Sequence, residues 1–154
     1  MAKPTSIPAD RKKLQIWILS AWSTCADAVL IFPPRPKRGG QEMMVLKGSV
    51  VQSSHLDSCP RNAERIRKRL ISLGKMKKTH DGMMLLEEDI VFGSPSQAAN
   101  VVHGESKNGW LFWKLGHRTG ASLSKAREQD REGHIKLLYY EKPEGVYEVR
   151  SEGW

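Results

Sequence analysis

Apolar residues in the middle of the chain recur at the spacing of an α-helix. The positions that form this stripe are Ala63, Ile66, Leu70 and Leu73. Their period of three to four residues predicts an amphipathic helix over residues 61–73, with charged side chains largely off the stripe. We expect Ser58 to cap this helix, Pro60 to start it and Gly74 to end it.

Shorter apolar runs on both sides of this helix are typical of β-strands. The strands that they predict comprise residues 28–32, 43–51, 75–78 and 83–86. Because glycine weakens a strand, we expect a bend at Gly48. Asp81–Gly82 suits the turn of a hairpin between the last two of these strands. Residues 14–22 are predicted to form either a buried strand or a short helix.

A capping box marks the start of a second, shorter helix. We expect the Ser94 hydroxyl to accept from the Gln97 N–H, while the Gln97 side chain reaches back to the Ser94 N–H. Pro95 fits the first helical position because its missing donor costs nothing there. Gly104 is expected to end the helix after about two turns.

Two further turns organise the rest of the chain. Asn108–Gly109 suits a tight turn that needs a positive φ, and a strand is expected to begin at Trp110. A turn over residues 142–145 predicts a hairpin between strands 135–141 and 146–150. Together the elements predict an α+β fold: a small mixed sheet with a basic helix and a short capped SPSxAA helix.

Charge changes this picture because it is concentrated in one segment. The chain has 154 residues and a net charge of +8. Residues 61–78 alone contain eight basic residues and one acidic residue, a net charge of +7. This concentration favours an anionic partner, such as nucleic acid or an acidic membrane surface. The alternative is a solvated basic face without a partner.

The basic side chains beside the apolar stripe are predicted to contact nucleic acid, mostly through its phosphates. They are Arg61, Arg65, Lys68 and Arg69 on the helix and Lys75 and Lys77 on the following strand. Trp110 or Trp113 can stack on an exposed base, and Asn108 can pair with a base edge. The alternative for each tryptophan is a place in the core, where large aromatic side chains dominate.

Signals for catalysis and for export are weaker. Asp89, Glu105 and Lys107 match a loose nuclease pattern of metal-binding carboxylates, but Glu105 and Lys107 fall in an expected turn. We therefore predict no catalytic residue, no metal site and no cofactor. We predict a cytoplasmic protein without a membrane partner. The chain has only two cysteines, its signal-peptide pattern is too weak to favour export, and it lacks a run of about 18 apolar residues.

The segment from Phe92 to Lys114 resembles the signature of RAMA-type domains, named for restriction enzymes and adenine methylases. The matching residues are Phe92, Ser94, Pro95, Ser96, Ala98, Ala99, Gly104, Asn108, Gly109, Trp110, Trp113 and Lys114. An uncharacterised bacterial relative, found C-terminal to GIY-YIG nuclease modules, is more similar still. The resemblance divides the chain into an N-terminal extension with a Pro/Gly linker (1–41), a RAMA-like domain (42–127) and a C-terminal extension (128–154).

This resemblance implies an accessory module that binds DNA in restriction or DNA modification. We accordingly predict a non-catalytic module that binds nucleic acid, with DNA as its partner and a nuclease or methyltransferase acting beside it. Two alternatives stay open: a protein-interaction module whose basic helix docks on an acidic partner, and a metal-dependent nuclease.

Overall fold

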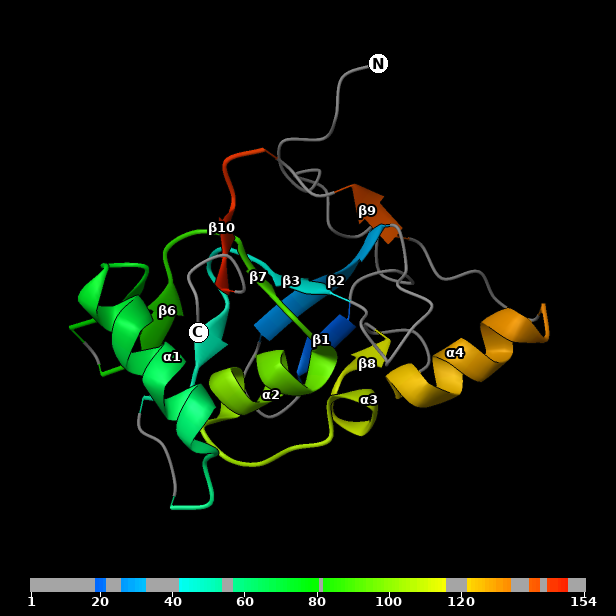
Figure 1. Cartoon of the computed structure of the whole chain (residues 1–154), viewed down its shortest axis with the longest axis horizontal. Helices are drawn as coiled ribbons and strands as arrows, with labels where there is room; N and C mark the ends of the chain where they lie inside the picture. Colours follow the sequence, from blue (N-terminus) through cyan, green and yellow to red (C-terminus); the bar gives the residue numbers. More distant parts are fainter. Residues whose placement is uncertain are drawn as a thin grey trace.

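The computed structural model has the predicted α+β architecture, in which helices pack on a mixed sheet (Figure 1). It describes residues 19–21, 26–32, 42–53, 57–80, 82–115, 122–133, 139–141 and 144–149. The helices in these ranges are α1 (Arg61–Ser72), α2 (Pro95–His103), α3 (Gly109–Phe112) and α4 (Leu123–Arg131). None of the helices described is long and apolar enough to cross a membrane.

The larger sheet has the strand order β10–β7–β3–β2–β1–β8, and β9 also pairs with β2. Its strands are β1 (Leu19–Ala21), β2 (Ala26–Phe32), β3 (Met43–Val45), β7 (Ile90–Phe92), β8 (Lys114–Leu115), β9 (Tyr139–Glu141) and β10 (Tyr147–Glu148). Strand β2 confirms the strand expected at residues 28–32. It joins residues of the expected N-terminal extension to the same sheet as β3.

The expected C-terminal hairpin is wrong. Strand β9 pairs in parallel with β2, and β10 pairs in parallel with β7, so the two strands have different partners. A strand pattern shows which side chains can face a core, but it does not show which strand lies beside it. Both pairings join segments that are far apart in the sequence, and local turn signals carry no information about them.

The smaller sheet is antiparallel and has the order β4–β6–β5, where β4 is Val50–Val51, β5 is Met76–Lys78 and β6 is Met84–Leu86. Strands β5 and β6 confirm the expected hairpin, with Gly82 at a φ of +87°. The expected bend at Gly48 is confirmed, because its φ is +86°. Residues 43–51 form two strands and not one, since the chain passes at this bend from β3 in the larger sheet to β4 in the smaller one.

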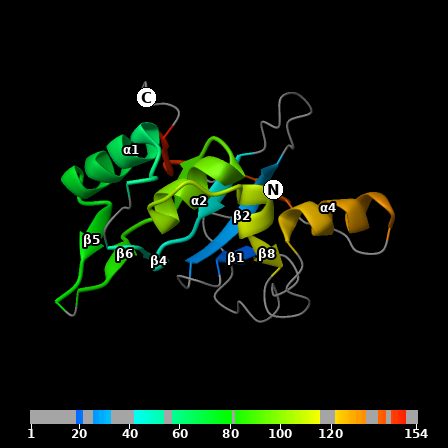
Figure 2. The ribbon, with the colours of Figure 1, turned by 90° about the horizontal axis from the view of Figure 1, so that it is seen from below.

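The core lies between the larger sheet and the helices, which are seen on one side of the sheet in Figures 1 and 2. Alternate strand residues such as Met43, Val45 and Phe92 pack in one buried cluster with Ile66 of α1 and with apolar residues of α2. The intervening strand residues form a second buried cluster, which contains Val29, Ile31, Met44, Leu46 and Val91. The alternation follows from the two-residue period of a strand.

Candidate nucleic-acid interface

Helix α1 is amphipathic, as its sequence predicts, but its start lacks the expected cap. Pro60 occupies the N-cap position and no side chain accepts from the first helical N–H groups, so the expected role of Ser58 is wrong. At the other end Gly74 has a φ of +73°, and its N–H donates to the carbonyl of Ile71. The expected end at Gly74 is therefore confirmed, because a left-handed glycine closes the helix.

The side of α1 that faces away from the core carries a cluster of basic side chains, here called the outer basic face. All of its members are exposed: Arg61, Arg65, Lys68 and Arg69. Ala63, Ile66 and Leu70 of the apolar stripe are buried on the opposite side, whereas Leu73 is exposed. Residues three or four positions apart are neighbours on a helix surface, so the four cations lie together.

The outer basic face is open to a ligand. Arg61, Glu64, Arg65 and Lys68 line a hollow on this side of α1. Within the described part of the chain, the structure gives Arg61 and Arg65 no carboxylate partner. Lys68 pairs with Glu64 at 3.0 Å, but its side chain is 69% exposed. Such exposed pairs contribute little and exchange readily with another anion.

Strand β5 extends the basic surface beyond the helix. Lys77 and Lys78 are both exposed, and β5 lies at the edge of the smaller sheet. Figure 2 shows this hairpin beside α1 at one end of the molecule. The Lys77 ammonium lies 3.8 Å from the Glu87 carboxylate of the adjacent turn. The Lys77 side chain is 64% exposed, so it stays accessible to solvent.

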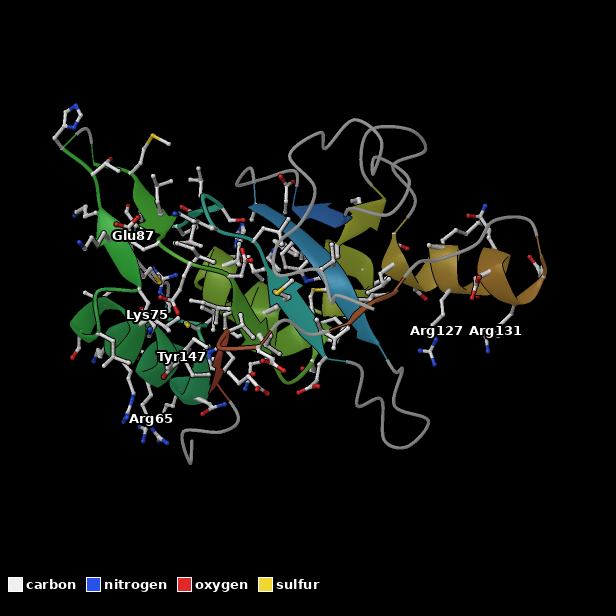
Figure 3. All side chains as sticks on the ribbon, turned by 90° about the horizontal axis from the view of Figure 1, so that it is seen from above. Arg65, Lys75, Glu87, Arg127, Arg131 and Tyr147 are labelled. Carbon is white, nitrogen blue, oxygen red and sulfur yellow. The ribbon has the colours of Figure 1, made fainter. Side chains whose placement is uncertain are left out.

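Lys75 differs from its neighbours because it is held inside the protein surface. Its ammonium group lies 3.0 Å from the Glu88 carboxylate and 4.7 Å from the centre of the Tyr147 ring. Figure 3 shows this side chain between α1 and the C-terminal strand β10. A cation that is paired with a carboxylate and placed over an aromatic ring is a structural tie. Lys75 is therefore less available to a ligand than Lys77, since its side chain is 23% exposed and that of Lys77 is 64% exposed.

Arg67 is a structurally important side chain that the sequence analysis missed. It is 3% exposed, and its guanidinium donates to the carbonyls of Val101 and Gln52. The Gln52 N–H in turn donates to the carbonyl of Val102. Arg67 thereby caps the C-terminal end of α2, where unpaired carbonyls and the helix dipole favour a positive charge.

The spacing of α1 contains the signal for Arg67. It follows Ala63 by four residues and Ile66 by one, and it precedes Leu70 by three, so it lies on the buried stripe. Burial lowers the pKa of the Arg67 guanidinium below its ordinary value. The hydrogen bonds to the two carbonyls compensate for the loss of hydration of the buried charge. One of the eight basic residues of segment 61–78 is thus part of the core.

Helix α2 follows its predicted capping pattern closely. The Gln97 N–H donates to Ser94 Oγ at 3.0 Å, Pro95 is the first helical residue, and Gly104 ends the helix with a φ of +74°. The Gln97 side chain accepts from the N–H of Gly93 at 2.8 Å, one residue earlier than expected. The box therefore satisfies one donor at the start of the helix and one in the preceding loop.

The expected strand at Trp110 is wrong, because residues Gly109–Phe112 form the short helix α3. Gly109 is needed for a close approach and not for a positive φ. A Cβ atom at this position would lie 2.2 Å from the carbonyl carbon of Pro95 and 2.4 Å from the N of Ser96. The Gly109 N–H donates to Ser96 Oγ at 2.9 Å, which fixes α3 against the start of α2.

The structure separates the predicted base-reading residues from α1. Trp113 is fully buried, and its Nε1 donates to the carbonyl of Pro95 at 3.1 Å, so the core alternative is correct for this side chain. Asn108 is exposed at the start of α3, which lies on the other side of α2 from α1 (Figure 1). The side chain of Trp110 lies outside the described set.

The residues of the loose nuclease pattern have other partners. Asp89 accepts from the backbone N–H of Lys47 at 2.7 Å. Glu105 pairs with Lys107 at 2.8 Å, and this hydrogen bond lowers the pKa of Glu105. Burial lowers the pKa of His103, whose Nδ1 lies 3.5 Å from Glu105. Among the residues that the structure describes, no three His, Cys, Asp or Glu side chains are grouped to hold a metal ion.

Comparison with known proteins identifies the family of the chain. Residues 35–127 match the model of a family described as a domain of unknown function, DUF4357, and the chain belongs to this family. The matched range contains α1, the smaller sheet, α2 and α3. No curated protein matches the chain, and no solved structure does.

Proposed function

We propose that the protein is a non-catalytic module that binds nucleic acid, most favourably DNA, through the phosphates of the backbone. The observation that supports this proposal is the outer basic face of α1, continued by Lys77 and Lys78. Its cations point to solvent from a helix that is anchored by its buried stripe and by Arg67. A rigid row of exposed cations suits phosphate contacts, which require charge at a fixed spacing and little base recognition.

The resemblance to RAMA-type domains favours DNA over RNA and links the module to restriction or DNA modification. In this proposal the protein holds DNA for a nuclease or methyltransferase that acts beside it. Trp113 is buried, so it offers no base-stacking side chain beside the cations of α1. Binding through α1 should therefore depend strongly on salt and weakly on sequence.

The test compares two pairs of charge removals with the same change in net charge. Arg61→Gln with Arg65→Gln removes the two cations of the outer basic face that have no carboxylate partner among the described residues. Lys47→Gln with Lys125→Gln is the matched control, because both lysines are exposed and neither belongs to α1. Fluorescence anisotropy with duplex DNA, single-stranded DNA and RNA over a range of salt concentrations measures the affinity of each protein.

We expect the α1 pair to weaken binding and to reduce the slope of log K against log salt by about 1.8, since each lost phosphate contact removes about 0.9. The control pair should leave this slope close to that of the parent protein. Equal slopes for the two pairs would remove the assignment of the surface. If the parent protein binds no nucleic acid, docking on an acidic protein becomes the better explanation of the basic face.

A further inference from the structure

The helices form one continuous layer that carries arginines at both ends. Helix α2 contacts α1 and α3, and α3 contacts α4, so the four helices are joined in this order. Figure 3 shows Arg65 of α1 at one end of the molecule and Arg127 and Arg131 of α4 at the other. In this view all three side chains point to the same side.

Helix α4, which carries two exposed arginines, is held by buried residues and by a side-chain cap. Leu123 and Ala126 are its buried residues, and the Ser122 hydroxyl caps its start by accepting from the N–H of Lys125 at 3.2 Å. Arg127 and Arg131 are exposed and four residues apart, so they lie on one face of the helix. The helix contains two acidic and three basic residues. The direction of the two arginines, and not the net charge of α4, distinguishes this face.

We propose that the arginine face of α4 is a second phosphate contact and that the partner is a duplex long enough to reach both ends of the helical layer. The proposal rests on the proposed function of α1. A duplex repeats its phosphates about every 3.4 Å along each strand, so one rigid ligand can meet two separated cationic sites. Arg127 is the last residue of the family match and Arg131 lies beyond it, so this contact falls at the end of the matched segment.

The size of the protein sets the length of the DNA probes. A folded chain of 154 residues has a radius of gyration of about 15 Å and is about 40 Å across. A DNA hairpin with about 6 base pairs spans about 20 Å and is too short to reach both helices from one position. A duplex of about 20 base pairs spans about 70 Å and is long enough.

The experiment measures the salt dependence of binding to these two probes for the parent protein, Arg131→Gln and Lys125→Gln. Lys125 is the control because it lies on the same helix and points away from the arginine face, about 120° around the helix axis. On the long duplex we expect Arg131→Gln to reduce the slope of log K against log salt by about 0.9. On the short hairpin its slope should equal that of the parent, and Lys125→Gln should match the parent on both probes.

An unchanged slope for Arg131→Gln on the long duplex overturns this proposal and leaves the proposed role of α1 standing. An equal reduction by Lys125→Gln also overturns it, because the effect is then one of net charge alone. If the parent binds neither probe, this proposal and the proposed function fall together.

Discussion

Helices α1 and α2 lie side by side but are stabilised in opposite ways. Helix α2 has a side-chain cap at its start, a left-handed glycine at its end and a mostly buried surface. Helix α1 starts without a side-chain cap and exposes a row of cations. In the proposed function the two helices divide their roles: α2 supports the fold, and α1 displays a surface to a partner.

Arg67 connects the two helices and refines this division. It belongs to α1, yet its guanidinium donates hydrogen bonds to a carbonyl at the end of α2 and to a carbonyl in the loop after β4. Arg65, two positions earlier, points to solvent (Figure 3). Basic residues in one helix therefore fall into two classes, and burial separates the structural arginine from those that a phosphate can reach.

The largest expected effect comes from the contact that supports α2. In Gly109→Ala the added Cβ would overlap backbone atoms of Pro95 and Ser96, and backbone cannot move aside as a side chain can. We expect the free energy of unfolding to fall by about 3 kcal/mol. Gly82→Ala is the control, because its Cβ meets open space and only the positive φ is strained; it should cost about 1 to 2 kcal/mol. Urea denaturation of both variants measures the difference.

The contrast between Arg67 and Arg65 should give the next largest effect. Arg67→Met leaves two carbonyls without their donor and should cost about 2 kcal/mol of stability. Arg65→Met changes an exposed side chain and should alter stability by less than about 0.5 kcal/mol, while it weakens DNA binding. Denaturation and binding measured on the same two proteins would show the reverse order if the assignment of these arginines is wrong.

Removal of the cap of α2 should have a moderate effect. Ser94→Ala deletes the oxygen that accepts from the Gln97 N–H, and this should cost about 1 kcal/mol. Ser72→Ala, at the exposed end of α1, should stay within about 0.5 kcal/mol. An unchanged denaturation midpoint for Ser94→Ala would show that packing alone holds α2.

The smallest expected effect is a pH dependence from His103, the last residue of α2. Its pKa in the folded protein is depressed by burial below the ordinary value of 6.5. The unfolded chain therefore binds a proton first, and the stability from neutral His103 is complete above pH 6.5 and is lost as the pH falls below it. His103→Gln should reduce the change in the denaturation midpoint between pH 7.5 and pH 5. A variant with the same pH dependence as the parent would contradict this role.

The comparison of the two helices also shows how far sequence reasoning reaches. Both helices and the hairpin at Gly82 follow from local spacing and turn chemistry, because neighbours along the chain determine them. The conformation at Gly109 does not follow from local sequence, because Gly109 packs closely against backbone that lies 14 residues earlier in the chain. The partners of β9 and β10 were missed for the same reason: they are set by pairing with distant strands.

The candidate site divides in the same way. Exposure of Arg61, Arg65, Lys68 and Arg69 could be predicted, because a helical period places them off the apolar stripe. The contacts that hold the Lys75 side chain could not be predicted, since Glu88 and Tyr147 come from other elements. Arg67 could have been found by extending the apolar stripe to include it.

Reversing the charge of the outer basic face decides whether this face of α1 is the nucleic-acid surface, as proposed. The variant combines Arg65→Glu, Lys68→Glu and Arg69→Glu, which leave the buried stripe unchanged. Binding of duplex DNA and RNA is measured at low and at physiological salt, and circular dichroism checks the fold. We expect the parent to bind DNA more tightly at low salt and the folded variant to lose most of this binding. Equal binding by parent and variant, with equal circular dichroism, would contradict it.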